Sequence, residues 1–528
     1  MEHSPTDDGP AAHDTAPAEP AWWQTKVVYQ IYPRSFADSN SDGIGDLEGI
    51  RSRLDHLQWL GIEVLWLSPV FRSPMADFGY DVSDYCDIDP VFGNLDDMDA
   101  LIADCHSRGM RLMLDWVPNH TSDQHPWFVE SRSSRDNAKA DWYVWRDKPA
   151  NNWLASFPKG EPAWEHDDVR DQWYLRCFLR EQPDLNWDNP DVEAAMHETL
   201  RFWLDRGIDG FRMDVVHLLG KHLGENDPEG AVARGFGHVP FNDVPETHDR
   251  IRGIRRVLDE YPGQRACVGE VYLLDEAKMA AYYGDGDELN LSFNFSFLWA
   301  AWDAATLRGK ISSTLEHLLP RRAWPTWVLS NHDVPRHRQR YGGSEDAARV
   351  AAVMLLTLPG TPFMYQGEEL GLIDAVVPPE RVVDPGGRDG CRAPIPWDAQ
   401  PGHGWPHTPW LPFVADAGTS NADSLEQQPD SILHLYRGLL HLRRDHAALQ
   451  SGAFTMIERT DDVIAYTLRP THPADSRTYT VALNLGEAAA VVPELAGGRV
   501  LTSTVARDLT APADSIVPPH AALVVLHA

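Results

Sequence analysis

The chain has 528 residues, with 46 Lys and Arg against 79 Asp and Glu, so its formal net charge is −33. A surface this acidic repels phosphate backbones and anionic lipid headgroups, which disfavours nucleic acid and membranes as partners. Hydrophobic residues make up 43% of the chain, yet no apolar run approaches the ~18 residues that cross a bilayer. We therefore expect a soluble, globular protein.

The cysteines and the N-terminus indicate where such a protein resides. The five cysteines are scattered and lack CxxC spacing, which favours buried thiols in a reducing compartment over disulfides or a zinc cluster. Residues 1–20 carry five acidic residues, no Lys or Arg and no apolar segment, so they resemble a disordered acidic tail rather than a secretory signal. The sequence predicts a cytoplasmic protein, monomer or homodimer, without an organic cofactor.

From residue 27 onward, short apolar runs alternate with amphipathic stretches of helical period. Strands that are apolar throughout and separated by helices indicate a parallel sheet covered on both faces. Eight such repeats predict an α/β fold of the (β/α)₈ TIM barrel type. The predicted strands are residues 27–33, 62–69, 111–117, 208–214, 266–271, 289–295, 325–331 and 361–366, and helices are predicted near 47–60, 95–108, 190–206, 246–260, 301–319, 344–356 and 431–449.

Two segments depart from this alternation. Residues 121–187, after the third strand, are too long for a plain loop and predict an inserted subdomain that shapes the site. Beyond residue 450 the hydrophobic period becomes two, at 463–468, 479–485, 499–505 and 521–526, which predicts a C-terminal antiparallel β-sandwich. The predicted domains are a barrel (21–120 and 188–450), the insert (121–187) and the sandwich (451–528).

Polar clusters follow four of the predicted strands, at the barrel end where TIM-barrel chemistry is located. They are Asp115 to His120, Gly210 to Asp214, Gly269-Glu270 and Asn331 to Asp333. A single acid after a strand is often only a helix cap, but four clusters at equivalent positions indicate a site.

These clusters, with the run 182–187, resemble the α-amylase family of glycoside hydrolases from Trp22 onward. The runs 28–36, 77–85 and 390–392 resemble its α-glucosidase and oligo-1,6-glucosidase branch. The resemblance implies that Asp214 is the nucleophile, Glu270 the general acid/base and Asp333 a third carboxylate that binds sugar hydroxyls. It also implies substrate contacts from Asp77, Tyr80, His120, Phe178, Arg212, Val215, His332 and Arg388.

The reaction needs these groups. Cleaving an acetal takes one carboxylic acid to protonate the leaving oxygen and one carboxylate to trap the oxocarbenium-like centre. Arg212 lies two residues before Asp214, so both side chains face the same side of a strand, and we expect the cation to keep Asp214 ionised.

A second candidate site is the loop 38–46, in which oxygen ligands recur every second residue around a turn glycine. The twelfth position is Gly49 rather than Glu, so the loop is not an EF-hand. The resemblance implies a structural Ca²⁺ or Mg²⁺ held by Asp38, Asn40, Asp42, the carbonyl of Ile44, and Asp46. A loop of Asx turns without a metal is the alternative.

Specificity stays open at this point. The run after Asp214 lacks the Lys and His of endo-acting amylases, and with Asp77 and Arg388 this implies a pocket for one terminal glucose. Val215 marks a position where Val accompanies α-1,6 preference in relatives, but one methyl contact is worth only ~1–3 kcal/mol. We predict a retaining, exo-acting α-glucosidase acting on short α-glucosides, linked α-1,4, α-1,6 or both. The alternatives are an oligo-1,6-glucosidase, a sucrose-active or transglycosylating enzyme and, more remotely, a non-catalytic binding barrel.

Overall fold

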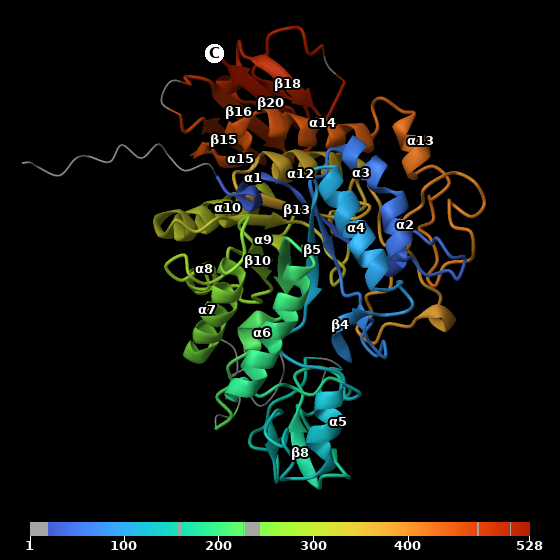
Figure 1. The fold of residues 1–528 in the computed structure, drawn as a ribbon. Helices are drawn as coiled ribbons and strands as arrows, with labels where there is room; N and C mark the ends of the chain where they lie inside the picture. The colour runs from blue at the N-terminus through green and yellow to red at the C-terminus, as the bar shows by residue number, and fades with distance from the viewer. Residues whose placement is uncertain are drawn as a thin grey trace, which may run out of the picture.

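The computed structural model describes residues 20–528, except 157, 159, 225, 227–242, 473–474 and 507. The predicted tail at 1–20 thus lies outside the described residues, apart from Pro20. Figure 1 shows a central barrel with the insert at one end of the molecule and the C-terminal sheet at the other.

An eight-stranded parallel sheet forms the barrel, in the order β11-β10-β9-β5-β2-β1-β13-β12. The hydroxyl of Thr326 in β12 donates a hydrogen bond to the carbonyl of Ser292 in β11, which joins the two end strands of this order. Each predicted strand is confirmed. The strands are β1 (Val28–Ile31), β2 (Val64–Leu67), β5 (Arg111–Trp116), β9 (Gly210–Met213), β10 (Ala266–Gly269), β11 (Leu291–Ser292), β12 (Thr326–Val328) and β13 (Thr361–Tyr365).

Helices follow the strands, and most lie where the periodicity predicts them. Two predicted helices are divided: 47–60 breaks at Arg53 into α2 and α3, and 431–449 breaks at His446 into α14 and α15. Gly61 ends α3 in the left-handed conformation, with φ 107°, which favours glycine. The helices around the sheet are α2 (Leu47–Ser52), α3 (Leu54–Leu60), α4 (Leu95–Ser107), α6 (Pro190–Asp205), α7 (Pro245–Asp259), α8 (Glu276–Ala281), α10 (Ala304–Leu318), α12 (Glu345–Thr357) and α14 (Ile432–Asp445).

Shorter elements complete the chain. They are α1 (Trp22–Thr25), β3 (Phe71–Arg72), β4 (Asp84–Ile88), α9 (Phe295–Leu298), α11 (His337–Arg340), α13 (Ala422–Glu426) and α15 (Ala447–Ser451). The insert contains α5 (Pro126–Ser133) and an antiparallel sheet of β6 (Trp145–Arg146), β8 (Gln172–Leu175) and β7 (Trp164–Asp167).

The C-terminal unit is an antiparallel sheet buried on both faces. Alternate residues of β15 enter two cores: Ile464 and Tyr466 pack with the barrel core, and Val463 and Ala465 pack under a second small sheet. The hydroxyls of Tyr466 and Thr357 in α12 lie 2.6 Å apart, which fixes the sheet to the barrel. The main sheet is β14 (Ala453–Ile457), β15 (Val463–Arg469), β16 (Thr478–Asn484), β20 (Ala521–His527) and β18 (Arg499–Ser503), and the small one is β17 (Ala490–Val491) with β19 (Ile516–Val517).

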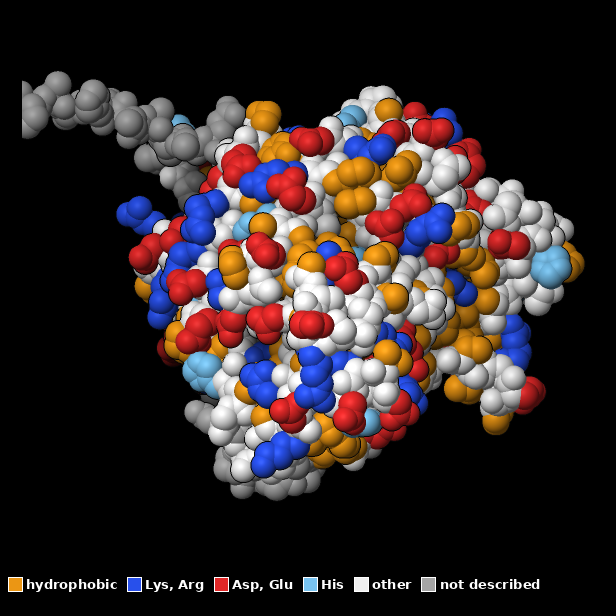
Figure 2. Space-filling view, turned by 60° about the horizontal axis from the view of Figure 1, so that its bottom comes forward, with side chains coloured by type: hydrophobic (Ala, Val, Ile, Leu, Met, Phe, Trp, Pro, Cys, Tyr) orange, Lys and Arg blue, Asp and Glu red, His pale blue; other side chains and the backbone are white. Residues whose placement is uncertain are grey.

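The surface agrees with the charge pattern of the sequence. Figure 2 shows acidic and basic side chains interspersed over one face, with hydrophobic patches between them. None of the helices formed by the described residues has the length and apolarity to traverse a bilayer. The domain boundaries given above stay a prediction.

Candidate active site

Arg212 is the centre of the site, at the carboxyl end of β9. Its Nη1 donates to Asp115 Oδ1 and to Asp214 Oδ1, both at 2.7 Å, and its Nη2 donates to Glu270 Oε2 at 2.6 Å. The parallel register of β5, β9 and β10 places Asp115 and Val268 beside Arg212, so the strand ends deliver these side chains to one point. One buried guanidinium therefore holds three carboxylates.

This cluster has more acid than one cation can neutralise. Burial raises the pKa of Asp214 well above its ordinary value; Arg212 opposes the shift and the Glu270 carboxylate adds to it. Burial likewise raises the pKa of Asp115 to about 7, against the effect of Arg212. We expected Arg212 to keep Asp214 ionised; the contact is present, but burial outweighs it.

Backbone strain orients the acid beside the nucleophile position. Val215 has φ 34°, a left-handed conformation that is a genuine outlier for a β-branched residue and costs ~1–3 kcal/mol. In this conformation the Val215 N–H donates to Glu270 Oε2 at 3.1 Å. The strained turn thus fixes the carboxyl of Glu270 relative to Asp214.

His332 lies between the carboxylates around Arg212 and those around Arg388. Gln30 Nε2 lies 2.7 Å from His332 Nδ1, and His332 Nε2 lies 3.3 Å from Asp333 Oδ2. With the Gln30 amide as donor, the imidazole carries its hydrogen on Nε2, which lies 2.5 Å from the Tyr80 hydroxyl oxygen and also faces Asp333. Burial lowers the pKa of His332 to about 3, so the ring is neutral, and it stacks on Tyr80 with centroids 5.5 Å apart. The Tyr80 hydroxyl also donates to Asp115 Oδ2 at 3.1 Å.

Arg388 forms the side of the candidate active site opposite Arg212. It donates to Asp77 Oδ1 at 2.7 Å, to Asp333 Oδ1 at 3.0 Å and to Asp384 through Nε and Nη2. Arg392 donates to the same Asp333 oxygen at 3.2 Å. Burial raises the pKa of Asp333, but His332 and the two arginines outweigh it, so its pKa lies below the ordinary value.

Residues of the insert complete the wall of the site. Gln182 Nε2 lies 3.2 Å from both Asp77 Oδ2 and His120 Nε2. The His120 and Phe178 rings lie 5.0 Å apart, and burial lowers the pKa of His120 to about 4. All the substrate and catalytic residues predicted from the sequence are thus connected by direct contacts or one intervening side chain.

Comparison with known proteins places this geometry in a family. Residues 30–452 match the alpha-amylase catalytic domain. The chain belongs to the α-amylase family. It is a glycoside hydrolase, as its curated relatives indicate.

The curated and structural relatives of this α-amylase-family chain cover most of its length. A probable alpha-glucosidase of Rhizobium meliloti (strain 1021) is 43% identical, over 84% of this chain and 86% of that protein. An oligo-1,6-glucosidase of Parageobacillus thermoglucosidasius is 36% identical, over 89% and 91%. The crystal structure of an alpha-glucosyl transfer enzyme has a TM-score of 0.88 at 36% identity, over 97% and 100% of the chains. That of an isomaltulose synthase from Protaminobacter rubrum has 0.89 at 32%, over 96% and 99%.

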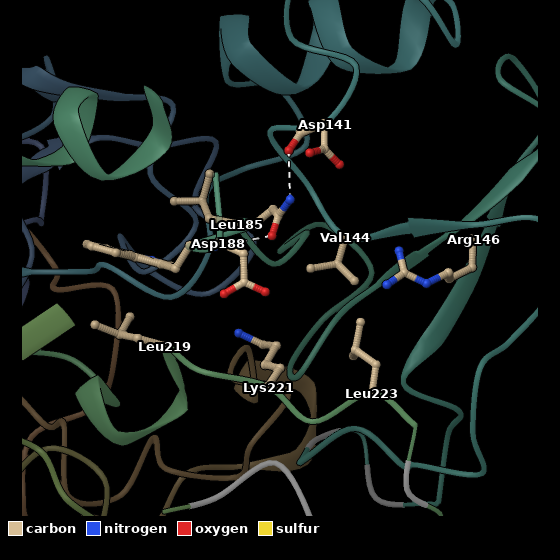
Figure 3. Close-up of a pocket in the computed structure, with 10 residues that line it drawn as sticks. Asp141, Val144, Arg146, Leu185, Asp188, Leu219, Lys221 and Leu223 are labelled. Atoms are coloured by element: carbon tan, nitrogen blue, oxygen red, sulfur yellow. Dashed lines mark hydrogen bonds between the residues drawn. The ribbon is translucent and has the colours of Figure 1, made fainter. Parts of the chain in front are cut away.

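Several residues of this α-amylase-family site were not predicted. Lys221 Nζ donates to Asn119 Oδ1 at 2.9 Å and to the Leu218 carbonyl at 2.7 Å, and lies 3.3 Å from Asp184 Oδ2. This cation therefore joins the insert to the strand ends beside His120. It lines a pocket of about 140 Å³, where Figure 3 shows Lys221 and Leu223 opposite Asp141 and Leu185 of the insert. Gln30, Asp115, Gln182, Asp184 and Arg392 lie in sequence runs that were singled out but had no predicted role, and Asp384 lies outside those runs.

The loop 38–46 lies outside this network. Asp38 accepts hydrogen bonds from the backbone N–H groups of Asn40, Ser41 and Gly43. Asp46 caps α2 by accepting from the Gly49 N–H at 2.6 Å. Within the described part of the chain, no group of three or more His, Cys, Asp and Glu side chains is placed to hold a metal. The loop uses the carboxylate oxygens of Asp38 and Asp46 in Asx turns and a helix cap.

Proposed function

We propose that the chain is a retaining, exo-acting α-glucosidase that releases terminal α-linked glucose from short oligosaccharides linked α-1,4, α-1,6 or both. The observation that supports this function is that Asp214 and Glu270 accept hydrogen bonds from the two Nη atoms of the same guanidinium, that of Arg212. Carboxylates held this close suit a covalent intermediate, whereas inverting enzymes keep them about 6.5–9.5 Å apart to admit water.

The proposed first step uses one acid and one carboxylate. The Asp214 carboxylate attacks C1 of the glucose unit while Glu270 donates its proton to the leaving oxygen, so the C1–O bond breaks and a glucosyl ester forms. Glu270, now a carboxylate, removes a proton from water, whose oxygen attacks C1 and releases Asp214. This step requires Asp214 to be ionised and Glu270 to be protonated when the substrate is bound.

The surrounding residues hold the same glucose unit. We assign Asp333, His332 and His120 to its hydroxyls, because the two neutral imidazoles can donate hydrogen bonds and Asp333 is ionised. The Asp77 and Arg388 ion pair closes the pocket beyond the sugar, which favours cleavage from a chain end.

Two neighbouring activities remain as second candidates. Curated relatives include oligo-1,6-glucosidases, and solved relatives include an alpha-glucosyl transfer enzyme and an isomaltulose synthase, which supports the oligo-1,6-glucosidase and the transglycosylating, sucrose-active alternatives. Product analysis on maltose, isomaltose, sucrose, trehalose and starch separates them. A hydrolase gives free glucose at low substrate concentration, whereas a transferase gives new disaccharides.

Two substitutions test the catalytic assignment. Asp214→Ala and Glu270→Gln should each lower hydrolysis of an aryl α-glucoside by orders of magnitude with the circular dichroism spectrum unchanged. Asp461→Asn is the control, because it changes an exposed carboxylate paired with Arg459 on the C-terminal unit. Near-normal turnover by either active-site variant would refute the assignment.

We keep a structural Ca²⁺ or Mg²⁺ as a proposal for the loop 38–46. What supports it is the chemistry of the donors: the oxygens of Asp38, Asn40, Asp42, Ile44 and Asp46 are the hard ligands that such cations prefer. The melting temperature should fall on adding EDTA and recover with Ca²⁺ or Mg²⁺. Identical melting curves with and without chelator would leave the loop as a set of Asx turns.

The cellular setting is a proposal as well. The five cysteines are all unpaired by disulfides, which supports a reducing compartment such as the cytoplasm. Fractionation of the source cells tests the location, and analytical ultracentrifugation distinguishes monomer from homodimer.

A further inference from the structure

A short loop carries Asp77 into the candidate active site, and the backbone of this loop is strained. Met75 has φ 66° and Phe78 has φ 49°, the left-handed conformation that residues other than glycine rarely adopt. For side chains of this size the conformation is unfavourable, so it persists only where the surrounding contacts determine it. The loop must therefore be held in this shape by another part of the chain.

The side chain of Asp81 supplies these contacts. Its Oδ1 accepts hydrogen bonds from the Asp77 N–H and the Ser73 hydroxyl, and its Oδ2 accepts one from the Ala76 N–H, all at 2.9 Å. Ala76 and Asp77 lie directly between the two strained residues. Burial raises the pKa of Asp81 to about 6 and the three donors oppose this shift, so at neutral pH the donors face a carboxylate.

Asp81 itself lies out of reach of a substrate, because none of its surface is exposed. Asp77, by contrast, extends from the same loop into the site. Its Oδ1 accepts from Arg388 at 2.7 Å and its Oδ2 accepts from Gln182 at 3.2 Å. The carboxylate of Asp81 therefore reaches the site through the backbone and side chain of Asp77.

We propose that Asp81 is a positioning residue, which fixes the backbone at Asp77 so that the Asp77 carboxylate and Arg388 meet the glucose unit in one orientation. This inference rests on the proposed α-glucosidase function, in which that ion pair closes the pocket. An amide in place of the Asp81 carboxylate turns its NH₂ group toward the N–H of either Ala76 or Asp77. In both cases the strained turn loses an acceptor, and we expect it to relax and to displace Asp77.

The first test is the KM of Asp81→Asn for 4-nitrophenyl α-glucoside. Losing one hydrogen bond to a charged group in substrate binding lowers kcat/KM at least about tenfold. We expect this loss mainly as a rise in KM, because the catalytic carboxylates keep their contacts.

Asp209→Asn is the matched control. Asp209 is also a buried carboxylate, and it accepts from the Leu112 N–H at 3.0 Å and from Arg111 at 2.7 Å. It precedes β9, at the end of the barrel away from the site. This variant should lower the midpoint of urea unfolding and leave KM unchanged.

A double-mutant cycle separates positioning from a general loss of stability. In an Asp77→Ala background, Asp81→Asn should change KM, or kcat/KM where saturation is not reached, by less than about twofold, because the side chain that it positions is absent. A general defect would change the same constant by the same factor in both backgrounds. If Asp81→Asn does not fold, Ser73→Ala removes a single donor and should raise KM about threefold, an effect that Asp77→Ala should abolish.

Three results would overturn the inference: an unchanged KM in Asp81→Asn, an equal rise with and without the Asp77 side chain, or an unchanged KM in Asp77→Ala, since Asp81 would then position a residue that does not bind the substrate. If the wild type cleaves neither 4-nitrophenyl α-glucoside nor maltose, it is the proposed function that fails.

Discussion

Asp384 offers the sharpest test of how the site is held, because its carboxylate touches two arginines and no catalytic carboxylate. Its Oδ2 accepts from the Arg388 backbone N–H at 2.6 Å and from Nε at 2.9 Å, and its Oδ1 accepts from Nη2 at 2.7 Å. Burial works against ionisation, but the bonds from Arg388 and the charge of Arg392 outweigh it, so the pKa of Asp384 lies below its ordinary value. The carboxylate is charged at every pH near neutrality.

Asp384→Asn keeps the shape, removes the charge and turns one oxygen into a donor that faces a guanidinium. Removing one partner of a buried ion pair costs about 3–5 kcal/mol of stability. The variant should also loosen Arg388 from Asp77 and Asp333. Losing one hydrogen bond to a charged group in the transition state costs about 1.5–3 kcal/mol, which lowers kcat/KM 10- to 150-fold.

Steady-state kinetics on maltose and urea unfolding measure the two effects. We expect KM to rise more than kcat falls, because the catalytic pair on Arg212 is untouched; a purely structural defect would instead lower the active fraction and leave KM constant. Asp461→Asn is again the matched control at an exposed ion pair. A kcat/KM within twofold of wild type would refute the idea that Asp384 positions Arg388.

Two further predictions concern buried charges elsewhere. Lys221→Met leaves Asp184 buried without its cation, so urea unfolding should show a loss of about 3–5 kcal/mol, and an unchanged midpoint would contradict the role given to Lys221. Burial raises the pKa of Glu368 to about 8, and the charge of Glu369 adds to it. The folded state therefore keeps a proton that the unfolded chain loses above about pH 4.3, and stability falls as pH rises toward 8. In Glu368→Gln the free energy of unfolding should fall less steeply with pH, by up to about 1.4 kcal/mol per pH unit. Equal pH dependence of the free energy of unfolding in variant and wild type between pH 5.5 and 7.5 would contradict a raised pKa of Glu368.

Local sequence pattern was sufficient for the barrel because its strands are mostly apolar and four of them end in a polar cluster. The period of two likewise predicted the C-terminal antiparallel sheet, whereas the burial of both faces of β15, in two separate cores, emerged only from the structure. What pattern fails to locate is the end of an element. The run 289–295 alternates apolar and polar residues as a strand does, yet β11 ends at Ser292, because Asn294 accepts a hydrogen bond from the Phe297 N–H and begins α9.

The contacts between loops were not predictable for a different reason. Arg388 and Asp77 are 311 residues apart in sequence, and nothing local to either residue indicates the other. Asp384 lies in a loop rich in glycine and proline where an acid has no periodic context, and Lys221 follows a strained turn at Val215 that sequence propensity argues against. These pairings exist only once the barrel has brought its loops to one end.

The distribution of cations over the site also explains why its carboxylates differ. Arg212 alone faces Asp115, Asp214 and Glu270, whereas Arg388 and Arg392 together face Asp77, Asp333 and Asp384. The first cluster is one charge further from neutrality, and the pKa of Asp214 is raised where that of Asp333 is lowered. With Glu270 protonated for the first step, the two clusters carry the same net charge, so what favours C1 beside Arg212 is the position of the Asp214 carboxylate, which can stabilise the positive charge that develops there. The charge distribution thus supports C1 near Arg212 and the remote hydroxyls near Arg388, the same orientation that the proposed roles of Asp214 and Asp333 require.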